Sequence, residues 1–356
     1  MLRSSAPKLQ SNPELKAIDA LIQEAGLVRN LRGKAAGVPR RIRFARAAPE
    51  ELSRAAPSPQ IAPNGVHWLP IPGWEKHPWL WHGFSTRQGG VSRAYCAEGG
   101  EGELNLGFTA ADERESVARN RRLLAESVSG DPATPLITIR QIHSNVLVVS
   151  GSGDAQGPSP TPEGHRGDGL MTDELGLLLG IQTADCIPVL VADRKRRAVA
   201  AFHAGWRGTV KRIVEVGVGR MRLEFGSRPE DLIAAIGPGI GVCCYAVGDE
   251  VLSSFESQFS YAHHLFREVY DTGPMRSKYP MLFLTQRAPG HSRIGPSLNL
   301  DLVEANRRQL LDAGLKPRSI QITGGCTSCQ PGLYFSHRAS HGHAGRMMSV
   351  IGIRPH

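Results

Sequence analysis

Residues 177–209 read LLLGIQTADCIPVLVADRKRRAVAAFHAGWRGT, and this stretch decides the expected fold. It holds three short apolar runs, at 177–181, 187–191 and 199–202, which are separated by turn-like segments. Apolar runs of this length are typical of buried strands, so a sheet is predicted here. From Thr209 onward the apolar residues recur at helical spacing, which predicts a helix after the sheet.

The sequence on either side predicts further elements. Asp112 and Glu115 form an N-terminal capping pattern, which predicts a helix that carries Arg121. Apolar spacing predicts one more helix, at 301–311. It also predicts three further strands, at 233–236, 320–323 and 348–353.

The chain is expected to have two regions. Residues 1–65 are predicted to be an N-terminal extension, partly disordered, with a short helix that begins at Asn12-Pro13. Residues 66–356 are predicted to form a single domain. Within it, the Gly-, Pro- and Ser-rich segment 150–167 is expected to be a surface insertion.

Composition excludes several classes of protein. The 356 residues are 40% hydrophobic and 21% charged, and no apolar run approaches the roughly 20 residues of a membrane helix. The net charge is +9, but residues 1–54 hold 11 Lys and Arg against 5 Asp and Glu, so the excess is local and nucleic-acid binding is not expected. Six cysteines are too few for a disulfide scaffold, which favours a reducing compartment, the cytoplasm by default. Import into an organelle remains an alternative if the extension is a transit peptide.

Three potential soft-metal ligands lie at the edges of predicted strands: His143 in QIHSN, Cys186 in TADC and His203 in FHAGWRG. Strand ends can converge in space, and one thiolate with two imidazoles suits zinc while leaving a fourth position open. Two alternatives remain. The residues could simply be packed in the core, or Cys186 could be a nucleophile with His203 as its base.

Nine strings add a resemblance to a known family. In order they are STRQGGVS, NLG, NRRLL, QIH, GDGLMT, TADCIPVLV, HAGWRGT, IGPGIGVCCYAVGDEV and CTSCQPGLYFSHR with a later GR. This pattern resembles the multicopper polyphenol oxidase, or laccase-domain, family, whose members are regarded as zinc-dependent purine nucleoside phosphorylases. The resemblance spans about residues 83–353, and TADC with HAGWRG is its most specific part.

The resemblance implies an α/β fold of layered mixed sheets with flanking helices, similar to the cytotoxic-necrotizing-factor-like fold of cysteine hydrolases. It implies a zinc ion held by His143, Cys186 and His203. It also implies phosphorolysis of adenosine, inosine, guanosine and methylthioadenosine, and deamination of adenosine. The expected partners are therefore purine nucleosides and phosphate, without nucleic acid or membrane, for a monomer or homodimer.

Further site residues follow from the chemistry of these reactions. Phosphate and a departing purine require cations. The resemblance supplies the candidates, because Arg87 and Arg121 match basic positions of the family motifs and are predicted to act in catalysis, while Arg207 of HAGWRG and Arg346 of the late Gly-Arg are predicted to bind substrate. Deamination requires a carboxylate that carries protons. Asp185 is the catalytic candidate. Asp168, predicted near the substrate, could equally cap a turn.

Neither the histidine pattern nor the spacing of the other cysteines indicates a further metal site. A multicopper oxidase needs about ten His in paired motifs, whereas this chain has a single His-x-His pair, His341 and His343, so copper is less expected than zinc. The Cys326-x-x-Cys329 pair lacks a second Cys-x-x-Cys, and Cys243 and Cys244 are adjacent, so both pairs are expected to serve the fold.

Two functions other than phosphorolysis stay open. One is a cysteine hydrolase that acts on an amide, such as an editing enzyme for peptidoglycan precursors. The other is a metal-holding interaction protein that docks through its basic N-terminal segment.

Overall fold

The structure of the protein is a computed structural model that describes residues 44–52, 58–96, 99–151, 165–269 and 297–355. From Phe44 onward the chain forms one compact unit. The predicted helix at Asn12, most of the predicted insertion 150–167 and nearly all of the basic segment lie outside the described residues.

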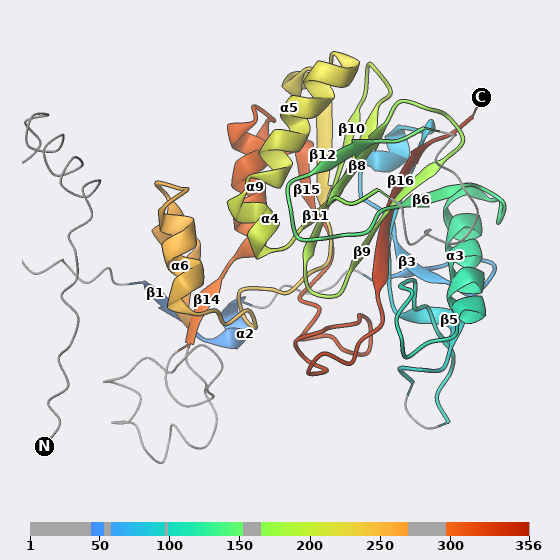
Figure 1. The fold of residues 1–356 in the computed structure, drawn as a ribbon, viewed down its shortest axis with the longest axis horizontal. Helices are drawn as coiled ribbons and strands as arrows, with labels where there is room; N and C mark the ends of the chain where they lie inside the picture. The colour runs from blue at the N-terminus through green and yellow to red at the C-terminus, as the bar shows by residue number, and fades with distance from the viewer. Residues whose placement is uncertain (1–43, 53–57, 97–98, 152–164, 270–296, 356) are drawn as a thin grey trace, which may run out of the picture. The chain divides into compact units, whose positions relative to one another are not determined.

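Two six-stranded sheets and one small sheet form the framework (Figure 1). Sheet I, in spatial order, contains β15 (Ile320–Ile322), β12 (Leu232–Ile236), β10 (Ile187–Asp193), β11 (Val199–Ala204), β8 (Gly169–Thr172) and β7 (Leu147–Val149). Sheet II contains β2 (Gln60–Ile61), β3 (His67–Leu69), β4 (Leu80–Ser85), β16 (Met347–Ile353), β9 (Leu178–Thr183) and β6 (Leu136–Thr138). The small sheet contains β1 (Ala45–Ala47), β13 (Phe266–Val269) and β14 (Ser297–Leu300). A further strand, β5 (Gln88–Ser92), follows β4.

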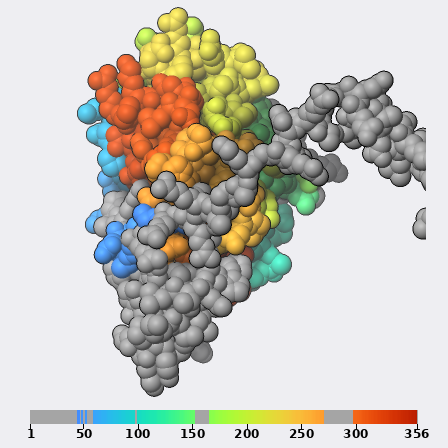
Figure 2. Space-filling view, turned by 90° about the vertical axis from the view of Figure 1, so that its left-hand side faces the viewer, coloured from blue at the N-terminus to red at the C-terminus, as the bar shows by residue number. Residues whose placement is uncertain are grey.

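Helices cover the outer faces of the two large sheets. The α-helices are α2 (Pro49–Leu52), α3 (Arg114–Ser129), α4 (Trp206–Val210), α5 (Ile213–Phe225), α6 (Asp249–Glu256) and α9 (Leu302–Asp312). Figure 2 shows α5 in yellow, α6 in orange and α9 in red-orange on one face of the molecule. Short 3-10 helices lie at Trp74–Lys76, Pro229–Asp231, Ala262–His264 and Pro317–Ser319.

The layers explain why β10 is apolar throughout. Val189 and Val191 pack into the core between sheet I and its helices, whereas Leu190 and Ala192 pack into the core between the two sheets. Both faces of the strand are therefore buried, and no polar alternation appears in its sequence. A third core lies between sheet II and α3, where Leu124 packs.

Close packing on β11 depends on a glycine of α5. A Cβ on Gly217 would lie 2.3 Å from the ring of Phe202, which is fully buried. A larger residue at this position would push the helix away from the sheet. This contact holds the strand residue directly before His203.

The predicted fold class is confirmed, as are the three strands of the opening stretch and the helix that carries Arg121. The helix predicted from Thr209 is divided into α4 and α5, because Arg212 has a φ of 58° in the left-handed region. The predicted domain start at residue 66 falls between β2 and β3, which pair with each other. Ahead of it, β1 pairs with β13, so residues before 66 also contribute to the compact unit.

No helix among the described residues is long and apolar enough to cross a lipid bilayer.

Candidate metal centre

One edge of sheet I collects the predicted metal ligands. Strands β10 and β11 are antiparallel, and Pro188 pairs with His203, so the start of β10 lies beside the end of β11. Cys186 immediately precedes β10, and His203 is the penultimate residue of β11. His143 precedes β7, which runs parallel to β8 at the same edge of the sheet. The sheet therefore brings three distant segments to one point.

The ligand atoms of these three residues lie within 4.8 Å of one another. The Sγ of Cys186 is 3.9 Å from Nε2 of His143, and the two imidazole rings meet edge to face with centroids 4.9 Å apart. His203 is buried, while His143 is exposed. One sulfur and two imidazole nitrogens around a common point form a donor set that suits a soft divalent ion.

A glycine leaves room beside the sulfur. A Cβ on Gly205 would lie 2.9 Å from Sγ of Cys186 and 3.2 Å from a ring carbon of His143. A side chain here would press on two of the three ligands. Gly205 thus keeps the space between Cys186 and His143 open.

Asp168 orients both histidines. Its Oδ1 accepts hydrogen bonds from Nδ1 of His203 at 2.8 Å and from the backbone N–H of His143 at 3.0 Å. Its Oδ2 accepts from the backbone N–H and the hydroxyl of Ser144, at 2.6 and 2.7 Å. Because Nδ1 of His203 is held by this carboxylate, Nε2 is the nitrogen free to bind a metal. Asp168 is fully buried, and this geometry favours a positioning role for it.

The charges in the cluster favour a thiolate and an imidazolium in the metal-free protein. Burial raises the pKa of the Cys186 thiol, but the neighbouring His203 charge and hydrogen bonds from both histidines outweigh burial and lower it to about 6. Burial lowers the pKa of His203, but Cys186 and Asp168 raise it to about 9. The sulfur is therefore already disposed to lose its proton, as a metal ligand must.

We expect Cys186 in chelator-treated protein to react with iodoacetamide with a midpoint near pH 6. The thiolate is the reactive form, so the rate falls as the pH drops below that value. Peptide mapping after timed alkylation measures each cysteine separately. Cys96 is the internal control, because burial raises its pKa and its reaction requires a higher pH. A midpoint for Cys186 at or above about 8.5, the ordinary thiol value, would contradict the assignment.

Asp185 lies in a strained turn next to the metal-ligand cluster. Its φ is 91°, which is uncommon for a residue with a side chain and typical of functional loops. Oδ1 accepts a hydrogen bond from the hydroxyl of Thr327, and Oδ2 accepts one from the backbone N–H of Arg338, both at 2.6 Å. These two bonds fix the turn that presents Cys186.

Tyr245 lies among the charged groups of this site. Burial raises the pKa of its hydroxyl, Cys186 and Asp185 raise it further, and Arg338 and Arg207 lower it. The Arg338 guanidinium lies 5.3 Å from the Tyr245 ring and donates to the carbonyl of Ala246. Arg207, in α4, is exposed and stacks on Trp206 at 4.4 Å. Arg338 and Arg207 therefore both lie near enough to Tyr245 to interact with its hydroxyl, and only Arg207 was predicted.

Most of the chain matches one known protein family. The family model described as multi-copper polyphenol oxidoreductase laccase matches residues 81–354. The chain belongs to this laccase family. A purine nucleoside phosphorylase of Bacteroides thetaiotaomicron is 36% identical over 76% of this chain and 91% of its own length. A protein named adenosine deaminase RL5, from an unknown prokaryotic organism, is 30% identical over 75% of this chain and 92% of its own length.

A solved member of the laccase family shares the fold. The crystal structure of YlmD from Geobacillus stearothermophilus superposes with a TM-score of 0.66 at 32% identity, covering 84% of this chain and all of that one. The relatives named above are enzymes, so this chain is an enzyme as well. The alternative of an amide-cleaving cysteine hydrolase gains no support from them.

The copper in the family description does not match the donor groups present. In the described part of the chain, two clusters of His, Cys or acidic residues could hold a metal. The cluster of His143, Cys186 and His203 contains two histidines, and the other contains none. A multicopper site requires about ten. His343, in the predicted pair with His341, packs against Tyr95 instead. The histidine-containing cluster of the described residues therefore has donor groups for one metal ion.

The remaining predicted arginines are engaged elsewhere. Arg87 donates to the carbonyl of Pro331 and forms an ion pair with Glu103. Arg346 donates to the carbonyls of Ala344 and Gly345. Arg121 is buried and donates to Leu106, but its Nη2 has no hydrogen-bond partner among the described residues. Burial lowers the Arg121 pKa to about 10. Their roles as phosphate or nucleoside contacts stay predictions.

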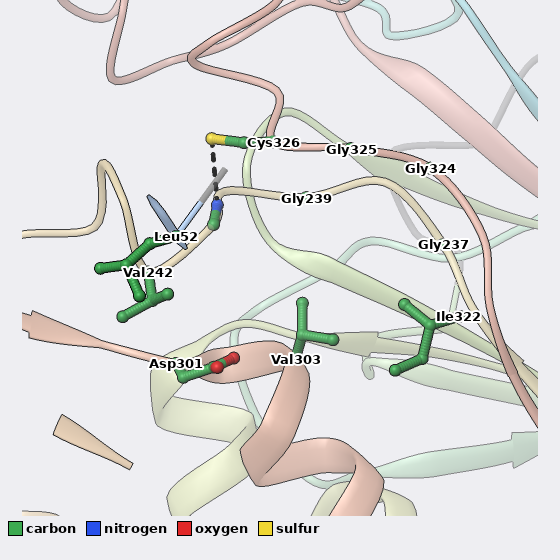
Figure 3. Close-up of a pocket in the computed structure, with 11 residues that line it drawn as sticks. Leu52, Gly237, Gly239, Val242, Asp301, Val303, Ile322, Gly324, Gly325 and Cys326 are labelled. Atoms are coloured by element: carbon green, nitrogen blue, oxygen red, sulfur yellow. Dashed lines mark hydrogen bonds between the residues drawn. The ribbon is translucent and has the colours of Figure 1, made fainter. Parts of the chain in front are cut away.

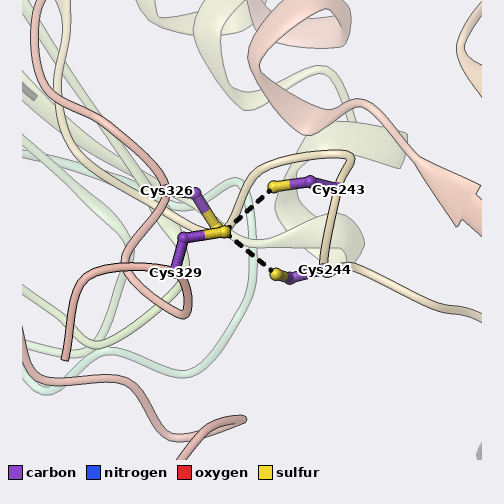
Figure 4. Close-up of side chains that lie close together, drawn as sticks. All are labelled: Cys243, Cys244, Cys326 and Cys329. Atoms are coloured by element: carbon purple, nitrogen blue, oxygen red, sulfur yellow. Dashed lines mark hydrogen bonds between the residues drawn. The ribbon is translucent and has the colours of Figure 1, made fainter. Parts of the chain in front are cut away.

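A second sulfur-rich group was not predicted as a unit. Cys243, Cys244, Cys326 and Cys329 lie together, with all four sulfurs within 4.8 Å of one another (Figure 4). Each pair alone lacks the spacing of a zinc motif, which explains why the sequence did not reveal the group. Cys326 also borders a pocket lined by Leu52, Val242, Asp301 and Val303, among others (Figure 3).

Proposed function

We propose that this protein is a zinc-dependent purine nucleoside phosphorylase that acts on adenosine, inosine, guanosine and methylthioadenosine and also deaminates adenosine. The observation that carries this proposal is the convergence of His143, Cys186 and His203 on one point, in a chain related to enzymes of these two names.

Zinc fits this site on the chemistry of its donors. Two imidazoles and a thiol of lowered pKa match its preferred ligands, and the Asp168 contact fixes the tautomer of His203. Three protein ligands are the usual number in a catalytic site, since the fourth position must stay accessible. When bound, zinc supplies Lewis acidity that stabilises negative charge on a substrate oxygen.

Phosphorolysis places specific demands on the surrounding side chains. A phosphate oxygen forms a bond to the anomeric carbon of ribose while the bond to the purine nitrogen breaks. The electron pair leaves with the purine, which takes up a proton. Arg207 and Arg338 carry positive charge near Tyr245, whose hydroxyl also interacts with Cys186, so phosphate can be held there despite its own charge. We assign Arg207 to phosphate, because its guanidinium is exposed and forms no ion pair within the described residues.

Deamination requires a group that transfers protons, and Asp185 is the candidate from the sequence. Both of its oxygens already accept short hydrogen bonds, from the hydroxyl of Thr327 and the backbone N–H of Arg338. Asp185 therefore serves first to position the Cys186 turn. We also propose that Asp185 transfers protons during the deamination of adenosine.

Incubation with inosine and phosphate tests the proposed activity. We expect hypoxanthine and ribose 1-phosphate in equal amounts, complete loss of turnover after chelation, and recovery when zinc is added back. Adenosine is expected to release ammonia under the same conditions. Absence of hypoxanthine at every metal loading would overturn the proposal.

The Arg207→Ala variant tests the phosphate assignment. We expect KM for phosphate to rise about tenfold or more, because a hydrogen bond to a charged group contributes about 1.5–3 kcal/mol. Initial rates at varied phosphate and fixed inosine measure the change. The matched control is Arg220→Ala, which removes an arginine of α5 that pairs with Glu224. Equal KM values in the two variants would remove Arg207 from the site.

A further inference from the structure

The topology of sheet I brings together four cysteines, namely Cys243, Cys244, Cys326 and Cys329. Strands β12 and β15 are parallel neighbours, so the loops that follow them leave the sheet at the same edge. The loop after β12 carries Cys243 and Cys244, and the loop after β15 carries Cys326 and Cys329. The two loops stay in contact through a bridge between Gly239 and Cys326.

The sulfur positions match the dimensions of a tetrathiolate site. Sγ of Cys329 lies 3.4 Å from Sγ of Cys243 and 3.3 Å from Sγ of Cys244. A tetrahedron with Zn–S bonds of about 2.3 Å has sulfur–sulfur edges of about 3.8 Å. The two distances from Cys329 are slightly shorter than this edge, and no pair of the four sulfurs is farther apart than 4.8 Å. Figure 4 shows their sulfur ends turned toward one another from the two loops.

The backbone around the group is arranged for negatively charged sulfur. The N–H of Gly241 donates to Sγ of Cys326 at 3.2 Å (Figure 3). Donors of this kind commonly support the thiolates of metal sites. The Arg338 guanidinium, which donates to the Ala246 carbonyl, supplies positive charge nearby.

Burial also suits a structural ion. Cys326 and Cys243 are 2% and 6% exposed, and Ile240 packs with them in a small apolar cluster. Cys329 is exposed and Cys244 is half-buried. An ion could therefore enter from the Cys329 side and be enclosed by the other three sulfurs.

We propose that Cys243, Cys244, Cys326 and Cys329 form a second metal site, which binds a thiophilic divalent cation, zinc in the first place, with four sulfur ligands. It is separate from the His143, Cys186 and His203 centre. Four protein ligands leave no open position, so this site is structural.

The second site would stabilise the turn that presents Cys186. Thr327 lies between two of the four cysteines, and its hydroxyl donates to Asp185. Its backbone N–H donates to the carbonyl of Gly239. Arg338, whose backbone N–H also donates to Asp185, contacts the carbonyl of Ala246 beyond Cys244. An ion that joins the two loops would thus fix the positions of Thr327 and Arg338, which both donate hydrogen bonds to the Asp185 carboxylate.

Metal counting on protein purified anaerobically from zinc-supplemented medium tests this proposal. We expect two zinc ions per chain in the wild type and one in Cys186→Ala. X-ray absorption of the Cys186→Ala protein should show a shell of sulfur alone at about 2.3 Å. These readouts do not depend on nucleoside turnover, so the second site is judged separately from the proposed activity.

Variants of the two less buried cysteines, Cys329 and Cys244, provide the decisive comparison. Cys329→Ser and Cys244→Ser should each fold and hold one ion per chain, with the remaining ion bound by the histidine-containing site. Cys96→Ser is the matched control and should hold two, because Cys96 lies outside both clusters. A wild-type protein with a single ion that disappears in Cys186→Ala would overturn the proposal. So would a disulfide between Cys329 and either Cys243 or Cys244 in the anaerobic protein, detected by mass.

Discussion

Replacement of Cys186 with alanine is expected to remove zinc from the histidine-containing site and to lower kcat/KM for inosine by at least about 100-fold. Loss of even a supporting partner of a metal ligand commonly costs 10–100-fold. The thiolate is one of only three protein ligands, and no other described sulfur belongs to that cluster. Without it, two imidazoles remain to hold the ion. Metal content and initial rates on the same sample measure both effects.

The same variant separates the metal enzyme from a cysteine nucleophile. If Cys186 attacked an amide substrate, chelation would leave turnover intact, and an electrophilic probe would label Cys186 with protection by substrate. Cys96→Ser is again the control, and we expect it to retain wild-type rates and the ion. Unchanged zinc binding at this site in Cys186→Ala would contradict the ligand assignment.

Asp168→Asn is expected to destabilise the metal-free fold by about 3–5 kcal/mol, the usual cost of removing one partner of a buried ion pair. The carboxylate is fully buried and accepts hydrogen bonds from His203, His143 and Ser144. An amide of the same shape turns a donor toward these donors. Zinc affinity should fall 10–100-fold as His203 loses its orientation. Urea unfolding of the metal-free protein and zinc titration measure the two effects.

The loss of stability in Asp168→Asn is expected to depend on pH. Burial raises the pKa of Asp168, but hydrogen bonds from His203 and Ser144 lower it to about 2, so its contribution to stability is present above about pH 4 and is lost below. His203 has a raised pKa of about 9, so its contribution is full below about pH 6.5 and is lost as the pH passes 9. The difference between wild type and Asp168→Asn should therefore be largest between about pH 4 and 6.5.

Asp193→Asn is the matched control for this experiment. Asp193 is also fully buried, and it accepts hydrogen bonds from the backbone N–H groups of Lys195 and Arg196. It ends β10, whereas Cys186 precedes the start of that strand. We expect it to lower stability and leave zinc affinity unchanged. An equal loss of affinity in both variants would show that the effect of Asp168 is general unfolding.

Most of sheet I could be predicted, because strands buried on both faces leave continuous apolar runs in the sequence. The division of the helix at Arg212 could not, since nothing in the sequence marks a left-handed residue with a long side chain. The helix around Arg121 was predictable from local spacing, but its N-cap is Glu113 rather than the predicted Asp112.

The convergence of His143, Cys186 and His203 was predictable, because they flank predicted strands and carry distinctive chemistry, and their role as ligands stays a proposal. The groups around them were not predictable. Tyr245 and Arg338 lie within quoted strings of the sequence, but only the fold shows that Tyr245 interacts with Cys186 and Arg338. The four-cysteine group depends on the pairing of β12 with β15, which no local pattern reveals.

The shared hydrogen bonds of Asp168 restrict how this centre can change during evolution. One carboxylate accepts hydrogen bonds from the ring of His203 and from the backbone N–H of His143. The bond from His143 does not depend on its side chain, whereas the bond from His203 is lost when the imidazole is replaced. Shifts in metal preference should therefore arise more readily by substitution at position 143 than at position 203, where Asp168 would have to change as well.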